Sequence, residues 1–408
     1  MLLKLNLNVV LAILAFGGVI AATTATPCTI TLPQDIKGYS PVILTKTPTT
    51  QATYSLFKPT GKVNRFPENS KLRLICTGSK NVITSLGINT AELTCSAGGQ
   101  FVDANNNPVQ LNSLVCNTIP ESALQKTSQK CSNNRGYIHE AGIEIPGDKF
   151  YRIFEICYNK TTETTLYTHN TLHGAVIRYN IAESTRRPFL AKHMSSNTRK
   201  VNEFYTKKNQ LARFEALFGA DQIYYDEKKN FLSRGHLTPD ADFMFGYEQL
   251  STYYYMNVAP QFQPINGGNW LKVEDMARSL AADYREDIES YNGYFGVVQL
   301  PNASGVQVTL YLDNQQQFYI PKYYFKVLTR KSADEAIVFL NVNNPFLSDP
   351  LSAEVCPNVC QKANLYQNEF ENRSKGYTFC CTLQDFKRVF NGLPNEVQGK
   401  RLLLAKKK

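Results

Sequence analysis

The sequence predicts an α+β protein with a mostly antiparallel sheet and flanking helices, preceded by a small disulfide-bonded β module. Long segments rich in β-branched and aromatic residues are typical of strands, and segments with helical spacing of apolar residues lie between them. Strands that are interrupted by helices favour the α+β class. A further observation predicts the module: five of the ten cysteines fall before residue 136.

Residues 1–21 have the pattern of a secretory signal peptide. Lys4 supplies a positive charge, NVVLAILAFGGVI is an apolar core, and Val19-Ile20-Ala21 forms a small-residue cleavage pattern. The apolar run is shorter than the roughly 20 residues that a membrane-spanning helix requires, and no basic cluster follows it. We therefore expect a secreted, extracellular protein that keeps no membrane anchor after cleavage.

Residues 28–136 are predicted to form the β module. LRLICTG, AELTCSAGGQFV and NSLVCN alternate apolar and polar residues and are separated by Gly, Asn and Pro, which is typical of short strands and turns. The placement of cysteines and strands resembles that of sushi-type domains. Two roles remain open for the module, namely contact with a substrate and assistance to folding and secretion.

The ten cysteines are predicted to form disulfides, because an even number of cysteines in an exported chain is expected to be oxidised. Zinc binding is the alternative for the last four cysteines of the chain. Their intervals lack a C-x₂-C pair, and adjacent cysteines rarely ligate one tetrahedral ion, so disulfides are favoured with the connectivity left open. The ten are Cys28, Cys76, Cys95, Cys116, Cys131, Cys157, Cys356, Cys360, Cys380 and Cys381.

Residues 140–400 are predicted to form the main domain, and residues 401–408 a solvated basic tail. Helices are expected at about 212–219, across 269–292 and near 383. The longest of these segments has apolar residues at helical spacing, namely Leu271, Met276, Leu280, Tyr284 and Ile288. Strands are expected in FYRIFEICYN, TLYTHNTLHGAVIRYNI, YFGVVQL, VQVTLYLD, YYFKVLT and AIVFLNV.

The chain is basic, with 44 Lys and Arg against 34 Asp and Glu and a formal net charge of +10. Such an excess favours polyanionic partners by long-range attraction, although many secreted proteins are basic. Asn159, Asn302 and Asn372 each begin an N-x-S/T sequence and are expected to be surface acceptors for N-glycosylation.

One stretch combines residue types that suit water activation at a phosphate. It reads FLSRGHLTPDADF followed by STYYYMNVAPQFQPINGGNWLKVEDMAR. The imidazole of His236 can take a proton near neutral pH, and the guanidinium of Arg234 can fork onto phosphate oxygens. Downstream, Asn257, Asn266 and Glu274 offer the hard oxygen ligands that Mg²⁺ prefers.

The spacing within this stretch resembles that of the DNA/RNA non-specific endonucleases, the ββα-metal nucleases with the signature Asp-Arg-Gly-His. In that family the His precedes the metal-binding Asn by thirty residues, and that Asn precedes a Glu by eight. His236, Asn266 and Glu274 keep both intervals, and Asn257 in NVAPQ and Trp270 match two further family positions. The resemblance covers about residues 145–400 and is greatest to the secreted arthropod branch, which includes the insect double-stranded RNases.

One position departs from the family pattern. Ser233 stands where the signature has Asp. If that Asp orients its neighbours by hydrogen bonding, a serine does so more weakly and without charge, which leaves the reaction rate and the metal preference open.

The resemblance implies a mechanism. His236 is the general base, Asn266 binds Mg²⁺ (with Mn²⁺ as the alternative ion), and Glu274 acts through a water of the hydrated ion. Asn257 orients water or the Asn266 side chain. The phosphate is held by Arg234 and an upstream arginine, for which Arg186 is preferred over its competitors Arg178 and Arg187.

The resemblance also implies the substrates and products. DNA and RNA, including double-stranded RNA, are cleaved to products with 5′-phosphate and 3′-hydroxyl ends. The alternative function is a secreted basic protein that binds nucleic acids or other polyanions on a nuclease-like scaffold without catalysis. The preferred substrate, the oligomeric state and the identity of any partner beyond nucleic acid are left open by the sequence.

Overall fold

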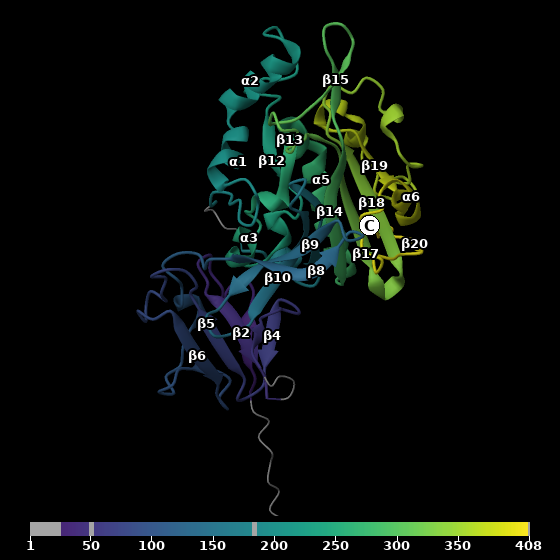
Figure 1. Cartoon of the computed structure of the whole chain (residues 1–408). Helices are drawn as coiled ribbons and strands as arrows, with labels where there is room; N and C mark the ends of the chain where they lie inside the picture. Colours follow the sequence, from purple (N-terminus) through teal and green to yellow (C-terminus); the bar gives the residue numbers. More distant parts are fainter. Residues whose placement is uncertain (1–25, 49–52, 182–185, 407–408) are drawn as a thin grey trace, which may run out of the picture.

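The computed structural model describes residues 26–48, 53–181 and 186–406. The predicted signal peptide lies outside the described residues. The N-terminal strands occupy one end of the molecule, and the remaining sheet and helices occupy the other, with strands β8, β9 and β10 between them (Figure 1). The predicted α+β class with a mostly antiparallel sheet is confirmed.

The N-terminal module contains a five-stranded sheet in the order β3-β2-β5-β6-β7 and a separate pair, β1 and β4. Disulfides Cys28–Cys95 and Cys76–Cys116 cross it. In NSLVCN the first two residues belong to a 3₁₀ turn, Leu111–Ser113, and Cys116 forms only an isolated β-bridge with Ile83 in place of the expected strand. The strands are β1 (Cys28–Thr31), β2 (Val42–Lys46), β3 (Ser55–Leu56), β4 (Val63–Phe66), β5 (Lys71–Ile75), β6 (Thr90–Cys95) and β7 (Phe101–Val102).

A nine-stranded sheet forms the centre of the main domain, in the order β19-β18-β17-β14-β11-β10-β9-β8, with β20 beside β18. All pairs are antiparallel except β18 with β20. The sheet begins upstream of residue 140, and its last strand lies in the expected basic tail. Its strands are β8 (Ala123–Cys131), β9 (Gly136–Glu144), β10 (Phe150–Asn159), β11 (Thr164–His173), β14 (Asp287–Val297), β17 (Pro321–Arg330), β18 (Glu335–Val342), β19 (Thr378–Cys381) and β20 (Arg401–Leu402).

Two small antiparallel pairs stand apart from this sheet: β12 (Leu232–His236) with β13 (Val258–Phe262), and β15 (Gln299–Pro301) with β16 (Gln307–Thr309). Helices α1 and α2 flank the first pair (Figure 1). The helices are α1 (Thr198–Phe204), α2 (Lys207–Phe218), α3 (Gly246–Leu250), α4 (Gln263–Ile265), α5 (Leu271–Tyr284) and α6 (Leu383–Val389).

The segment 269–292, expected to be one helix, contains a helix followed by a strand. Helix α5 ends at Tyr284 because Arg285 adopts a left-handed conformation with φ of 56°. The following residues form β14, which pairs with β11 on one side and β17 on the other. Ile288, expected on the apolar face of the helix, is instead a buried residue of this central strand. Pairing with two distant strands outweighs the local helical pattern.

Alternate residues of the central strands face opposite sides of the sheet. On one face, Leu172, Ile288 and Leu328 pack against the buried side of α5. On the other face, Phe325 and Val338 pack with the C-terminal residues, including Phe379 and Phe386 of β19 and α6. Helix α5 therefore lies on a single face of the sheet, and its buried residues are determined by that contact.

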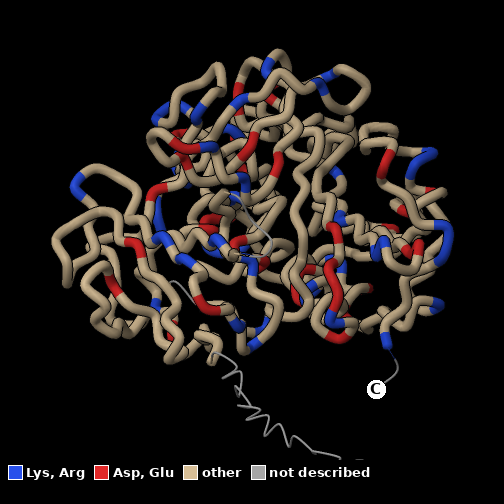
Figure 2. The backbone as a smooth tube through the Cα atoms, turned by 90° about the horizontal axis from the view of Figure 1, so that it is seen from below, with Lys and Arg blue, Asp and Glu red and all other residues tan. Residues whose placement is uncertain are grey.

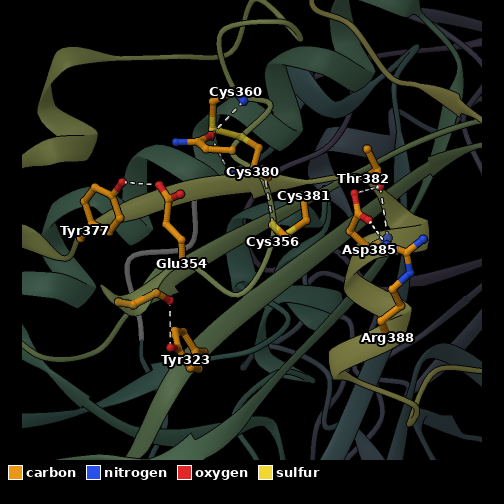
Figure 3. Close-up of a disulfide and its surroundings, with 12 residues drawn as sticks. Tyr323, Glu354, Cys356, Cys360, Tyr377, Cys380, Cys381, Thr382, Asp385 and Arg388 are labelled. Carbon is orange, nitrogen blue, oxygen red and sulfur yellow. Dashed lines mark hydrogen bonds and ion pairs between the residues drawn. A yellow bond between two sulfur atoms is a disulfide. The ribbon is translucent and has the colours of Figure 1, made fainter. Parts of the chain in front are cut away.

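The C-terminal segment is tied to the sheet by two neighbouring disulfides, Cys356–Cys381 and Cys360–Cys380 (Figure 3). The adjacent cysteines of β19 point to opposite faces, Cys380 into the core beneath α5 and Cys381 into the core beneath α6. Together with Cys131–Cys157 and the two bonds of the module, these disulfides use all ten cysteines. The prediction of disulfides over zinc is confirmed.

The module and the main domain share one hydrophobic core. Phe57 of the module lies 6.1 Å, between ring centroids, from Phe245 at the start of α3, and Phe245 stacks on Tyr247 at 5.2 Å. Tyr253, which follows α3, belongs to the same core. The segment that contains α3 is therefore supported by the module.

No helix within the described ranges combines the length and apolar character needed to cross a membrane. Basic and acidic positions are mixed along the backbone in the view of Figure 2.

Candidate active site

The predicted site residues lie on consecutive elements. Strand β12 ends at His236 and pairs with β13, so that Arg234 lies opposite Pro260 and His236 opposite Val258. The chain then passes through α4 and a π-helical turn, Asn266–Trp270, into α5. His236 is thus held at the end of a strand.

The ring of His236 packs beside two aromatic side chains, Phe189 and Tyr253, whose own ring centroids are 4.9 Å apart. Its centroid is 5.2 Å from the ring centroid of Phe189 and 5.2 Å from that of Tyr253. The Nε2 atom is buried and has no hydrogen-bond partner among the described residues. Burial lowers the pKa of His236, which nearby Arg186 lowers further and Asp240 opposes. At neutral pH the imidazole is therefore uncharged and able to accept a proton.

Asn257 is fully buried and holds the chain just after His236. Its Oδ1 accepts from the Thr238 backbone N–H at 3.0 Å, and its Nδ2 donates to the carbonyls of Thr238 at 2.8 Å and Thr252 at 2.9 Å. The backbone N–H of Leu237 donates to the Asn257 carbonyl. The side-chain amide of Asn257 therefore fixes the direction in which the chain leaves β12 after His236.

Replacement of Asn257 with alanine is expected to lower the free energy of unfolding by about 1–3 kcal/mol, because buried backbone groups lose their partners. It should also lower kcat more than it raises KM, since His236 loses its fixed position. Urea unfolding and steady-state kinetics measure both effects. Asn105→Ala, at an exposed position, is the control. A normal kcat in a destabilised Asn257→Ala protein would contradict the positioning role.

The turn that contains Asn266 is supported by the C-terminal segment. Asn269, fully buried, donates to the carbonyls of Glu369 at 2.6 Å and Gly376 at 2.8 Å. Gly268 has a non-helical φ of −107° and ψ of −118°, and a Cβ there would lie 2.9 Å from the Lys375 carbonyl oxygen. By contrast, Asn266 is half-buried and its amide has no partner among the described residues. Its amide is available to a ligand, and the Oδ1 atom of Asn269 is likewise without a hydrogen-bond partner among the described residues.

The Glu274 carboxylate lies on the buried side of α5 and is 8% exposed. Burial raises its pKa to about 8, and the charges of Lys326 and Arg278 oppose that increase. Asp242 and Asp240 act in the same direction as burial. The kink at Gly268 lies between Asn266 and Glu274, so the two are not on one regular helix.

Arg234 is enclosed by aromatic rings. Its guanidinium carbon lies 4.7 Å from the centroid of Tyr205, 5.6 Å from that of Tyr255 and 5.8 Å from that of Phe189. Its Nε donates to the Tyr255 hydroxyl at 3.0 Å, and its NH2 group donates to Asn202 of α1 at 2.5 Å. Two of its five N–H donors are therefore used within the protein.

The three upstream arginines have different environments. Arg178 forms an ion pair with Asp283 at 2.7 Å, and Arg187 donates to Ser122 at 2.7 Å. Arg186 is exposed and lies close enough to His236 to affect its pKa. Ser233, at the departure from the family signature, donates to the Gln261 carbonyl at 3.0 Å across the β12–β13 pair.

Sequence reasoning missed a set of buried charged and polar residues beneath the site. Asp242 is 4% exposed and pairs with Arg278 at 3.1 Å, and Lys326 has no exposed surface. The lysine inside the apolar segment YYFKVLT is the sequence feature that could have indicated this buried charged group. Trp270 is fully buried, with its ring 5.4 Å from that of Tyr324 on β17.

Within the described parts of the chain, no group of three or more His, Cys, Asp or Glu side chains is arranged to hold a metal ion. The carboxylate that lies close enough to His236 to affect its pKa is that of Asp240.

Comparison with protein families matches residues 134–386, which include all the predicted site residues, to the model described as DNA/RNA non-specific endonuclease. Salivary protein Tsal1 of Glossina morsitans morsitans is 32% identical over 380 residues, covering 92% of this chain and 94% of that protein. A salivary endonuclease of Lutzomyia longipalpis is 30% identical over 404 residues, covering 98% and 92%. One of Culex quinquefasciatus is 26% identical over 290 residues, covering 69% and 73%.

Proposed function

Because the chain belongs to the DNA/RNA non-specific endonuclease family, we propose that it is a secreted, Mg²⁺-dependent enzyme that hydrolyses phosphodiester bonds in DNA and RNA, including double-stranded RNA. The observation that carries this proposal is the state of His236. Its Nε2 atom is buried without a protein partner among the described residues, and its lowered pKa leaves it uncharged. Such an imidazole is suited to general-base catalysis.

Two residues of the predicted site carry groups that suit a hydrated Mg²⁺ ion. The Asn266 amide supplies a hard oxygen without a competing protein partner in the described structure, and Glu274 supplies a buried carboxylate. Mg²⁺ commonly binds proteins through one or two such groups and keeps several waters. Asn266 would hold the ion, with Mn²⁺ as the alternative, and the bound ion would neutralise charge that develops on the phosphate.

The chain's own groups then perform the hydrolysis. His236 takes a proton from a water molecule, whose oxygen forms a bond to phosphorus as the bond from phosphorus to the 3′ oxygen breaks. The 3′ oxygen takes a proton from solvent, so that the products have 5′-phosphate and 3′-hydroxyl ends. Arg186 contacts the phosphate, while Asn257 and the enclosed Arg234 hold β12 and the following turn in position.

This chemistry acts on the sugar–phosphate backbone. It uses neither a base edge nor the ribose 2′-hydroxyl, which permits both DNA and RNA as substrates. Secretion is supported by the paired state of all ten cysteines, because disulfides persist in oxidising compartments. Relatives named as salivary proteins and salivary endonucleases support it as well.

The proposal predicts that plasmid DNA, single-stranded RNA and long double-stranded RNA are degraded with Mg²⁺ and remain intact with EDTA. Gel electrophoresis at fixed salt measures this. The 5′ ends should accept a new phosphate from polynucleotide kinase only after phosphatase treatment. A retarded but intact band in Mg²⁺ and in Mn²⁺ would instead support the alternative of a basic polyanion-binding protein without catalysis.

A further inference from the structure

Positive charge is concentrated in the segment that surrounds β12. Residues 186–236 carry eleven Lys and Arg against five Asp and Glu, an excess of six in a chain whose formal net charge is +10. The same segment supplies Arg186, Phe189, Arg234 and His236 of the candidate site. More than half of the net charge of the protein therefore belongs to the part of the chain that carries the proposed base.

Four lysines of this segment gather at the start of α2 and in the loop before β12. We call them the basic cluster: Lys207, Lys208, Lys228 and Lys229. The ammonium group of Lys207 lies 5.1 Å from the ring centroid of Phe231, and its carbonyl accepts from the Tyr225 hydroxyl at 3.0 Å. Lys207 thus contacts both ends of the loop that carries Lys228 and Lys229.

The basic cluster is exposed and has little local compensation. None of its four ammonium groups forms an ion pair with a described residue. The loop contributes two carboxylates. Asp226 Oδ1 accepts from the backbone N–H groups of Lys228 at 2.9 Å and Lys229 at 2.7 Å, and Glu227 makes no ion pair within the described ranges. Four cations therefore face solvent beside two carboxylates.

The charges of α2 do not stabilise the helix itself. Its first turn contains Lys207 and Lys208 and no acidic residue, and its last turn contains no basic residue. This is the reverse of the arrangement that the helix dipole favours, in which anions lie near the N-terminus and cations near the C-terminus. The stability of α2 therefore gives no reason for the two lysines.

The basic run near the C-terminus is in a different environment. Lys400 Nζ lies 3.8 Å from a carboxylate oxygen of Asp334, and Arg401 lies 3.8 Å from one of Glu335. Arg401 also begins β20, which pairs with β18 at the edge of the main sheet. These cations are paired within the protein, so unpaired positive charge is a local property of the basic cluster.

Two sets of contacts join the basic cluster to the candidate site. The side chain of Gln210 on α2 donates to the carbonyl of Leu232 on β12 and accepts from its backbone N–H, both at 2.8 Å. Two residues further along the strand, Arg234 packs on the ring of Phe189, which also contacts His236. Because a strand rises about 3.3 Å per residue, the basic cluster begins about 16 Å from the proposed base.

We propose that the basic cluster binds the phosphates of a nucleic-acid strand that extends from the candidate site along β12 toward α2. This inference rests on the proposed function and adds to it the surface that holds the substrate beyond the cleaved bond. A duplex presents one phosphate per strand for about every 3.4 Å of its axis, so the cluster contacts phosphates about five nucleotides from that bond. Ammonium groups bind phosphates as point charges and read no base, which agrees with recognition of the backbone alone.

Equilibrium binding to the full-length protein in EDTA tests this surface. The probes are fluorescently labelled 20-base-pair DNA and RNA duplexes, and anisotropy is measured over a series of salt concentrations. Replacement of all four lysines with glutamine should raise Kd at fixed salt by about tenfold or more. It should also reduce the slope of log Kd against log salt by about 2 to 4 for DNA, because each phosphate contact contributes about 0.9 to that slope.

A charge-matched control distinguishes a local surface from the net charge of the protein. It replaces with glutamine four exposed lysines of the module, which lies at the opposite end of the molecule from α2 (Figure 1): Lys37, Lys58, Lys62 and Lys80. The control should keep the parent slope. An equal change of slope in both variants, or an unchanged slope in the cluster variant, would overturn the inference.

A smaller variant leaves α2 intact, so that an effect on folding of the helix is separated from an effect on binding. Lys228→Gln combined with Lys229→Gln should give about half of the change in slope. No change of slope in this double variant would show that the loop is not part of the surface and would contradict the inference as stated.

Cleavage of plasmid DNA gives a second readout. The variant that lacks all four lysines should raise KM more than it lowers kcat, because the cluster is remote from the reacting atoms. A lowered kcat with the parent KM would contradict a binding surface. If the parent protein neither binds nor cleaves nucleic acid, the proposed function fails together with this inference. If the parent cleaves and the cluster variant binds as the parent does, the inference alone fails.

Discussion

Replacement of His236 with alanine is expected to lower kcat by about 10²–10⁴-fold, the usual contribution of a positioned general base. Nucleic-acid binding and secretion should persist, because the Nε2 atom of the side chain makes no hydrogen bond within the described structure. Initial rates on plasmid DNA and double-stranded RNA, together with a salt-dependent binding assay, measure both properties. A His236→Ala protein that retains the parent turnover would exclude His236 as the base.

A matched control is available on β11. The side chain of His173 is 41% exposed and pairs with Asp287 at 3.2 Å, on strands β11 and β14 of the main sheet rather than on the β12–β13 pair. His173→Ala should therefore keep the parent rate.

The pH profile of cleavage is a second test of the site. Since the pKa of His236 is lowered and that of Glu274 is raised to about 8, the acid limb at low metal concentration should follow Glu274: activity should fall as the pH falls through its pKa.

Replacement of Phe245 with alanine is expected to lower the free energy of unfolding by about 3–5 kcal/mol, the usual cost of removing a buried phenyl ring. The ring is 1% exposed and joins Tyr247 of the main domain to Phe57 of the module. Urea unfolding followed by fluorescence and circular dichroism measures the loss. Leu351→Ala, at a side chain that is 72% exposed, should cost about 0.5 kcal/mol or less.

The shape of the unfolding curve is a further expected result. Because the module and the main domain share one core, they should unfold in a single transition, and Phe245→Ala should move that transition as a whole. Two separated transitions, with only one of them shifted, would show that the module is an independent domain.

The candidate site could be predicted from the sequence because its order along the chain follows local structure. The signature around His236, the N-x-x-P-Q segment and the residues from Asn266 to Glu274 occupy a strand, a strand and a helical unit in succession. Periodicity also identified α2, α6 and most strands of the sheet. These features depend on residues close together in the sequence, which is what spacing reports.

The features that could not be predicted depend on pairing between distant residues. Ile288 fits the helical pattern of α5, and only its position between β11 and β17 makes it part of a strand. Lys326 acquires its environment from the register of β11, β14 and β17, which are not consecutive in the sequence. The support of α3 by Phe57 likewise requires the module to be in place. No periodicity in a single segment carries this information.

The carbonyls of Glu369 and Gly376 support the turn that contains Asn266. This support matters when truncated members of the family are compared with full-length ones. Every residue of the recognisable motif lies before residue 275, whereas the carbonyls that hold the turn lie in a segment fastened by Cys356–Cys381 and Cys360–Cys380. A shortened copy that stops before Cys356 would match the motif in full and still lack the backing of its proposed ion-binding amide. Intact motifs in truncated copies are therefore a poor guide to whether those copies remain working enzymes.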